Sequence, residues 1–250
     1  MFCSFGPTYF DYMAKSFFHN FPCCIAKIIG AYEVIITDEN DRDNDSRTFI
    51  LASENLNLGL KPEDEPNLIR FDLKGSENNR LATPPIGPDG RLERVVLLDS
   101  NFLYKMRARP VCLPFEDALK LHICISNDVD CLKKMNIVDY SLLAVIDTKR
   151  KKIRFGILDY CQFFNSKKHV EYMLKSTVNL GGLPTIVPAE LYRYRFVTFM
   201  TNHFIGVSNQ LKLRPSSKKH SSTRDHKRPS KVVKVEVLGI DEIVSSSQSQ

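Results

Sequence analysis

Several patterns that would place this chain in a particular protein class are missing. Its seven cysteines show no paired CxxC spacing, so a zinc site is not expected, and their scatter over apolar segments indicates reduced thiols within a core. The first residues contain no basic region followed by an apolar run, which argues against a signal peptide. The most apolar stretch, residues 22–36, is interrupted by Lys27 and Glu33 and is too short to cross a bilayer.

The charge of the chain is concentrated near its C-terminus. The net charge is +6 over 250 residues, and residues 214–231 hold seven basic residues and one acidic residue. This segment therefore accounts for the whole excess. Proline and serine are interspersed there, which is typical of a disordered linker. Two interpretations stay open: attraction to anionic lipid, at about 1 kcal/mol per basic residue near such a surface, or a solvated tail that binds nucleic acid weakly.

Two aspartates flank a predicted β-hairpin. Residues 141–147 and 153–159 are β-branched and apolar runs joined by the polar connection 148–152, a length that suits a hairpin. In an antiparallel pair, the start of the first strand lies beside the end of the second. Asp139 precedes the first strand and Asp159 closes the second, so both carboxylates are expected at one open end. Neighbouring strands lie about 4.8 Å apart, which lets the two side chains flank one metal–phosphate unit.

Such a pair meets the needs of phosphoryl transfer. In that reaction one aspartate holds Mg²⁺ and another orients the attacking hydroxyl. The alternative is that Asp139 and Asp159 are ordinary turn residues, because aspartate is common at strand ends. The upstream segment 72–76 favours the functional interpretation, since it places Lys74 before a glycine that lets the backbone approach a phosphate.

Short segments along the chain also match a known signature. Five blocks occur in a fixed order: residues 5–10 with 25–32, residues 71–76 with Arg80, residues 137–143, residues 156–160, and residues 175–193. The second block reads DLKGS followed by arginine, and the third contains DYSLL. In these blocks the chain resembles the phosphatidylinositol phosphate kinases, and it is most similar to the PIKfyve-type branch, the phosphatidylinositol-3-phosphate 5-kinases. The resemblance covers about residues 5–204, and residues 97–103 also resemble a family segment.

The resemblance implies an α+β, kinase-like two-lobe fold and ATP-dependent phosphorylation of a phosphatidylinositol phosphate with Mg²⁺. It implies that Asp139 orients the inositol hydroxyl, that Asp159 binds Mg²⁺ at the nucleotide phosphates, and that Lys74 stabilises phosphate charge. A head group with several negative charges needs lysine or arginine in its pocket. The candidates for this role are Lys167, Lys168 and Lys175.

One departure from the family bears on activity. The family carries a glycine-rich phosphate loop and a strand lysine ahead of the first matched segment, and nothing like them stands before Phe5. We therefore expect a small lobe that is truncated at its N-terminus, and impaired activity in this chain alone. The competing hypothesis is a catalytically inactive relative that binds a phosphoinositide membrane, a full-length kinase or a scaffold partner. Nucleic acid is the least favoured partner.

The expected organisation is a kinase domain over residues 1–213, a basic linker over 214–231, and a short apolar segment with a polar tail over 232–250. The expected location is the cytoplasm, at the surface of endosomal or other anionic membranes.

Hydrophobic periodicity predicts the elements around the site. A helix is expected over residues 7–20, with Tyr9, Phe10, Met13 and Phe17 as its core-facing stripe. Strands are expected over 27–37 and 48–52, joined by the acidic turn 38–45, and residues 53–56 would form the hinge against which an adenine lies. A long helix is expected over 115–132. Three polar residues are given structural roles: Asn101 in a turn, His122 as a satisfied buried histidine, and Arg193 in a salt bridge.

Overall fold

The computed structural model describes residues 2–38, 41–87, 93, 95–163, 187–208 and 234–237. Its helices are α1 (Phe2–His19), the short 3₁₀ helix η1 (Pro62–Asn67), α2 (Asp99–Met106), α3 (Phe115–Lys134) and α5 (Ala189–His203). Its strands are β1 (Ile28–Asp38), β2 (Asp41–Ser53), β3 (Leu68–Leu73), β4 (Val111–Pro114), β5 (Ile137–Val138), β6 (Ser141–Asp147), β7 (Lys152–Leu158), β8 (Gln162–Phe163), β9 (Phe204–Val207) and β10 (Lys234–Val237). The α+β class expected from the sequence is confirmed.

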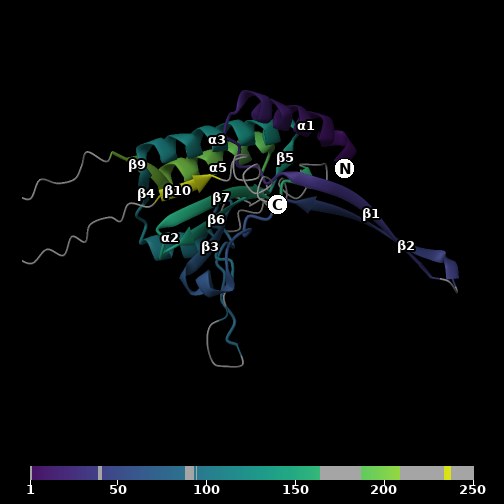
Figure 1. Ribbon diagram of the computed structural model, residues 1–250, viewed down its shortest axis with the longest axis horizontal. Helices are drawn as coiled ribbons and strands as arrows, with labels where there is room; N and C mark the ends of the chain where they lie inside the picture. The colour runs from purple at the N-terminus through teal and green to yellow at the C-terminus, as the bar shows by residue number, and fades with distance from the viewer. Residues whose placement is uncertain are drawn as a thin grey trace, which may run out of the picture.

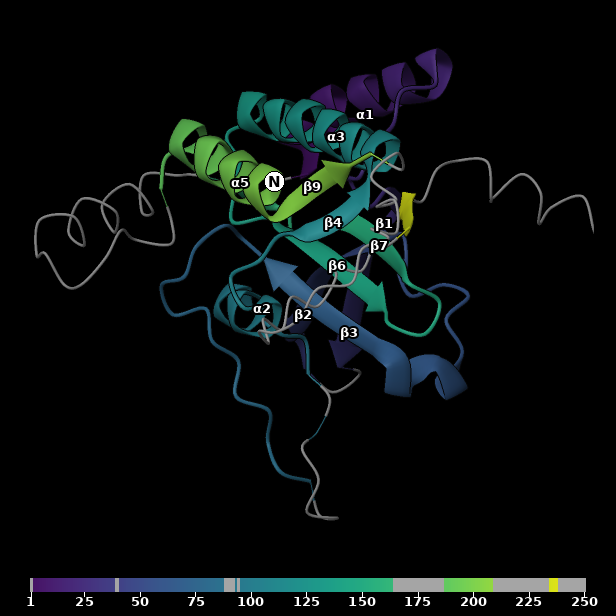
Figure 2. The same cartoon turned by 90° about the vertical axis from the view of Figure 1, so that its left-hand side faces the viewer.

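A four-stranded sheet in the order β10-β7-β6-β3 forms the centre of the molecule. Helices α1, α3 and α5 lie together over one face of this sheet, and α2 lies beside β3 (Figures 1 and 2). Short segments add to this sheet beside β7 and along its β3 edge. Residues 24–26 bond to Ile157 of β7, and residues around Leu97 run along β3 through the bonds of Leu97 with Arg70 and Asp72.

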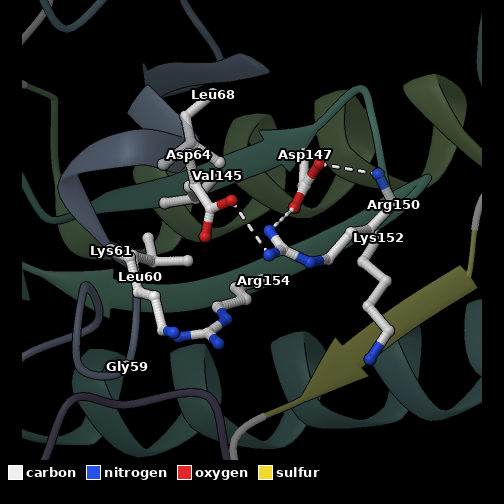
Figure 3. Close-up of a pocket in the computed structure, with 10 residues that line it drawn as sticks. All are labelled: Gly59, Leu60, Lys61, Asp64, Leu68, Val145, Asp147, Arg150, Lys152 and Arg154. Atoms are coloured by element: carbon white, nitrogen blue, oxygen red, sulfur yellow. Dashed lines mark hydrogen bonds and ion pairs between the residues drawn. The ribbon is translucent and has the colours of Figure 1, made fainter. Parts of the chain in front are cut away.

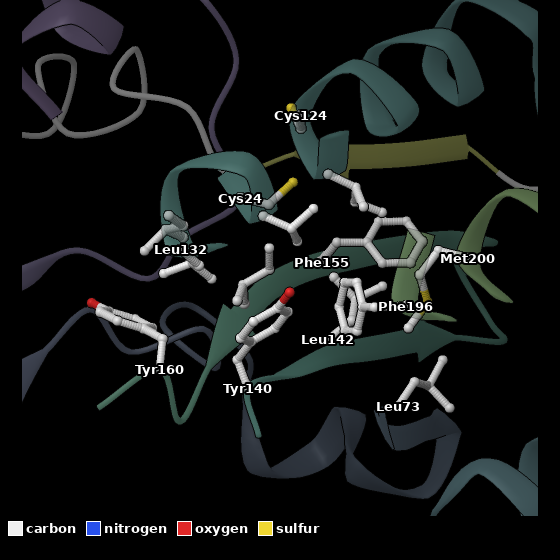
Figure 4. Close-up of a cluster of buried hydrophobic side chains, with 14 of the residues drawn as sticks. Cys24, Leu73, Cys124, Leu132, Tyr140, Leu142, Phe155, Tyr160, Phe196 and Met200 are labelled. Atoms are coloured by element: carbon white, nitrogen blue, oxygen red, sulfur yellow. The ribbon is translucent and has the colours of Figure 1, made fainter. Parts of the chain in front are cut away.

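The central strand β6 is buried along its whole length. Alternate residues of a strand point to opposite faces, so Leu142 joins the main core beneath the helices, whereas Leu143 joins a smaller cluster on the other face. Figure 4 shows the main core, in which side chains of β6 and β7 meet those of α3 and α5. A strand covered on both faces has one register that buries it correctly, so the ends of β6 and its neighbours are placed firmly.

Two predictions about local structure were wrong, one of them only in part. In α1, Tyr9 is buried as expected, but Phe10 and Phe17 are 52% and 56% exposed. The buried face carries Phe5 and Ser16 together with Tyr9, and Met13 packs against the core as expected. The acidic turn expected over residues 38–45 is mostly strand, since β2 already begins at Asp41 and pairs with the end of β1.

The β1–β2 ribbon projects from the body of the molecule (Figure 1). Its two strands pair only with each other among the described residues. Apolar side chains lie on both of its faces and are largely exposed, with Ile29 at 73% and Phe49 at 79%. A two-stranded ribbon is marginally stable by itself, and large exposed apolar patches commonly mark contact surfaces.

Candidate functional site

Three strands bring three charged residues to one edge of the central sheet, the edge at which β3 and β7 end and β6 begins. β3 pairs antiparallel with β6, and β6 pairs antiparallel with β7, where Ser141 lies opposite Leu158. The ends of β3 and β7 therefore lie beside the start of β6. Lys74 directly follows β3, Asp139 lies two residues before β6, and Asp159 directly follows β7. The predicted hairpin is confirmed, and both carboxylates emerge from the same end of it.

Lys74 and Asp139 form an ion pair. The Nζ atom of Lys74 lies 2.9 Å from Oδ1 of Asp139, and the two side chains are only 13% and 17% exposed. Partial shielding from water strengthens such a pair relative to one on the open surface. Asp159 is exposed at the same edge, so its carboxylate is accessible to a ligand.

Both aspartates adopt the left-handed backbone conformation, with φ of +67° at Asp139 and +59° at Asp159. Aspartate visits this region more readily than most residues, but the conformation still costs roughly 1–2 kcal/mol for an L-residue. Each aspartate is followed by a buried tyrosine that anchors the turn. The carbonyl of Tyr140 accepts a hydrogen bond from a tyrosine hydroxyl of α5, and the hydroxyl of Tyr160 donates to the carbonyl of Ala26. Strained backbone that the surroundings hold in place is common at functional sites.

A carboxylate that the sequence did not reveal organises the turn that carries Lys74. Asp99, the first residue of α2, is fully buried. Its Oδ1 accepts the backbone N–H groups of Lys74, Gly75 and Ser76 at 3.1, 2.8 and 3.3 Å. Its Oδ2 accepts the Nε–H of Arg80 at 2.8 Å. The turn is thus bound to α2 by a single side chain.

Arg80 joins this carboxylate to β3. Its Nη2 donates to the backbone carbonyl of Asp72 at 2.6 Å and to the side-chain Oδ1 of Asp72 at 3.1 Å. Burial by itself lowers the pKa of Arg80, but the hydrogen bonds and charges of Asp99 and Asp72 outweigh it and raise the pKa above its usual value. Arg80 therefore stays charged. Its place in the matched signature, and the resemblance of residues 97–103 to a family segment, were sequence signals that pointed toward this network.

The predicted adenine hinge lies against an apolar surface. Glu54 donates its backbone N–H to the carbonyl of Lys27 at 2.8 Å, and its carboxylate lies 3.2 Å from Nζ of Lys27. Leu56 is buried against Gly156, where an added Cβ would come within 2.2 Å of its Cδ1. Leu56, Leu68, Leu143 and Val145 form the smaller apolar cluster. Adenine binding at residues 53–56 stays a prediction.

The two aspartates suit a magnesium ion that is shared with a phosphate. Among residues that the structure describes, no group of three or more His, Cys, Asp or Glu side chains could hold a metal. Mg²⁺ usually keeps several waters and takes one or two carboxylates together with substrate phosphates. An accessible Asp159 beside the Lys74–Asp139 pair fits that pattern.

The candidate substrate lysines, Lys167, Lys168 and Lys175, lie outside the described residues. Within the described part, a pocket of about 480 Å³ adjoins Gly75 on the side of the Lys74 turn. Apolar side chains contribute much of its lining, among them Val187, Leu191 and Phe199. An apolar surface thus lies next to the charged edge.

A second pocket, of about 290 Å³, lies at the opposite end of the β6–β7 hairpin (Figure 3). Arg150 in the hairpin turn lies 2.9 Å from Asp64 and 2.8 Å from Asp147. The hydrogen bond from Arg150 is the main reason that the pKa of Asp64 lies below its usual value. These ion pairs fasten the hairpin turn to η1, which is a structural role.

The three polar residues expected to be structural all make structural contacts, although His122 is half-buried rather than buried and Asn101 lies within α2 rather than in a turn. Nε2 of His122 lies 2.7 Å from the carbonyl oxygen of Phe204. Arg193 donates Nε–H to Oδ1 of Asp130 at 2.6 Å. The amide of Asn101 accepts the backbone N–H of Leu98 at 3.0 Å at the start of α2.

Comparison with known protein families agrees with this architecture. The family model described as phosphatidylinositol-4-phosphate 5-kinase matches residues 1–154 and 145–203. The chain therefore belongs to the phosphatidylinositol phosphate kinase family.

Individual relatives come from the 3-phosphate 5-kinase branch. The 1-phosphatidylinositol 3-phosphate 5-kinases of Homo sapiens and Mus musculus are each 36% identical over 210 residues, which is 82% of this chain and 10% of each relative. That of Saccharomyces cerevisiae is 31% identical over 211 residues, 82% of this chain and 9% of the relative. The chain thus spans about a tenth of the length of these relatives.

In the part of the chain that the structure describes, no helix has both the length and the apolarity needed to traverse a bilayer.

Proposed function

We propose that this chain carries the catalytic edge of an ATP-dependent phosphatidylinositol phosphate kinase, with phosphatidylinositol 3-phosphate as the substrate and the 5-hydroxyl as the acceptor. The observation that carries the proposal is the meeting of Lys74, Asp139 and Asp159 at one edge of the sheet, with Lys74 and Asp139 in contact at 2.9 Å. Turn residues with no function would not need a buried network that places a lysine against Asp139. The names of the relatives supply the substrate.

Each residue has a distinct role in this proposal. Asp139 accepts the hydrogen bond of the inositol hydroxyl and orients it toward the γ-phosphate. Lys74 lies beside it and stabilises the negative charge that develops on the phosphoryl oxygens. Asp159 holds Mg²⁺, which neutralises charge on the nucleotide phosphates when bound. Lys167, Lys168 and Lys175 are proposed to contact the head group, and the basic segment 214–231 is proposed to attract the chain to anionic membrane.

The proposal is tested by measuring phosphoryl transfer from ATP to phosphatidylinositol 3-phosphate in vesicles. The reference is the rate of the wild-type chain, measured with and without a family-type glycine-rich loop and strand lysine added at its N-terminus. Lys74→Met and Asp139→Asn should each lower the rate by about 10²–10³, as removal of a positioned group typically does. Asp159→Ala should abolish it together with Mg²⁺ binding.

The matched control is Lys61→Met, because Lys61 is an exposed lysine at the second pocket, at the far end of the hairpin. It should leave the rate unchanged. Turnover that survives both Lys74→Met and Asp139→Asn would rule out the proposed roles.

A second candidate function is a binding module without turnover. The exposed apolar faces of the β1–β2 ribbon and the exposed aromatic side chains of α1 favour it, because they offer a contact surface in addition to the charged edge. Under this alternative, the extended chain binds phosphatidylinositol 3-phosphate vesicles or a partner kinase but transfers no phosphate.

A further inference from the structure

The turn that carries Lys74 is held by an arrangement that differs from ordinary helix capping. Asp99 begins α2, yet its carboxylate accepts three consecutive N–H groups from a segment 23 to 25 residues away. Consecutive backbone N–H groups that converge on one point make an anion-binding concavity. Here a buried side-chain carboxylate occupies that concavity, and Arg80 balances its charge at 2.8 Å.

The same turn is pinned from its other side by α5. Gly75 has φ of +70°, and a Cβ placed on it would come within 3.1 Å of the carbonyl oxygen of Arg195 and 3.2 Å of Cα of Phe196. The backbone on either side of the Lys74–Gly75 peptide therefore has little room to move. The Lys74 side chain leaves this fixed backbone and ends on Asp139.

We propose that Asp99 is a positioning residue that acts, with Arg80 as its counter-charge, to place the Lys74 ammonium beside Asp139. Asp99 touches neither the ion pair nor any reacting group in this arrangement; it fixes the backbone from which Lys74 extends. That Lys74 then acts on the nucleotide phosphates rests on the proposed function. That Asp99 holds Lys74 beside Asp139 does not depend on it.

The placement is tested by chemical acetylation of lysines with a succinimidyl ester, followed by mass spectrometry of the folded chain. Lys74 should label slowly because it is shielded and ion-paired. Asp99→Asn should raise its labelling several-fold, to the level produced by Asp139→Asn, which removes the ion-pair partner directly. Lys27, paired with Glu54 on a different part of the chain, serves as the internal reference and should not change.

Two further variants separate positioning from general loosening. Asn101→Ala removes a side chain of the same helix turn that bonds to Leu98 and Ala82 but not to the Lys74 turn. It should lower stability and leave Lys74 labelling at the wild-type rate. Arg80→Lys keeps the charge but cannot span Asp99 and Asp72 together, so it should raise Lys74 labelling partway. If Asp99→Asn does not fold, the labelling of Lys74 in Arg80→Lys tests the inference in its place.

Nucleotide binding gives the second readout. Lys74→Met and Asp99→Asn should each weaken the affinity for Mg·ADP relative to adenosine, and the double variant should be no weaker than Lys74→Met alone, because one residue acts through the other. Additive losses, unchanged Lys74 labelling in folded Asp99→Asn or Arg80→Lys, or a parallel rise at Lys27 would each overturn the inference. If Lys74→Met leaves Mg·ADP affinity unchanged while Asp99→Asn still exposes Lys74, the positioning stands and the proposed phosphate role fails.

Discussion

Asp128 gives a pH-dependent term in stability that can be calculated from its surroundings. It lies in α3 with no exposed surface, and it accepts hydrogen bonds from neutral donors: the hydroxyl of Tyr12 at 2.6 Å and the backbone N–H of Cys24 at 2.5 Å. Among the described residues it has no cationic partner within ion-pair distance. Burial disfavours its charged form and raises the pKa of Asp128 from 3.8 to about 6.

The sign and size follow from linkage. Because the folded-state pKa is the higher one, the folded chain binds the proton more tightly than the unfolded chain does. This contribution to stability is complete below about pH 4 and is lost as the pH rises through about 6. A shift of roughly two units at about 1.4 kcal/mol each gives about 3 kcal/mol.

The assay is urea unfolding followed by circular dichroism between pH 4 and pH 7.5, since the chain has no tryptophan. Other carboxyls titrate in the opposite sense; Arg193, for example, lowers the pKa of Asp130. The quantity to follow is therefore the difference in unfolding free energy between wild type and Asp128→Asn. We expect wild type to lose about 3 kcal/mol relative to the variant between pH 4 and pH 7. A difference that stays constant over this range, or that changes in the other direction, would refute the reasoning.

Three further expectations concern the site edge and the tail. Asp159→Gly should leave the free energy of unfolding equal or up to about 1 kcal/mol higher, because glycine relieves the positive φ. The same variant should lose Mg²⁺ binding in a metal titration. Retained binding would show that Asp159 is only a turn residue. Gly75→Ala should cost at least about 1 kcal/mol in urea unfolding, since alanine is strained at φ of +70° and contacts α5; an unchanged midpoint would contradict this. Deleting residues 214–231 should remove most of the salt-dependent binding to anionic vesicles in a sedimentation assay, and equal binding at low salt with and without them would exclude a lipid role.

The local part of the site could be predicted from sequence, and the long-range part could not. The β6–β7 hairpin follows from two apolar runs and a short polar connection, so the common end of Asp139 and Asp159 is a matter of spacing. The contact of Lys74 with Asp139 depends on β3 pairing with β6, and no local pattern specifies that pairing. The matched signature pointed to Lys74 without giving its partner.

Asp99 was missed for a related reason. Its partners are backbone N–H groups, which every residue except proline carries, so no side-chain pattern marks them. The segment containing it drew attention to Asn101, which bonds to Leu98 and Ala82 and not to the Lys74 turn. The stripe assigned to α1 was half right: Tyr9 and Met13 face the core, whereas Phe10 and Phe17 are exposed. Several aromatic residues follow one another closely there, and more than one helical face satisfies the periodicity.

The strand order also sets a sequence of events during folding. The two aspartates belong to a hairpin that closes over a few residues, whereas Lys74 and Asp139 are 65 residues apart in the chain. Closing a long loop costs more entropy than closing a short one, and non-local pairings form more slowly. A refolding chain is therefore expected to gather both carboxylates before the lysine reaches them. Protection of Lys74 from labelling during refolding would then measure the moment at which β3 joins the sheet.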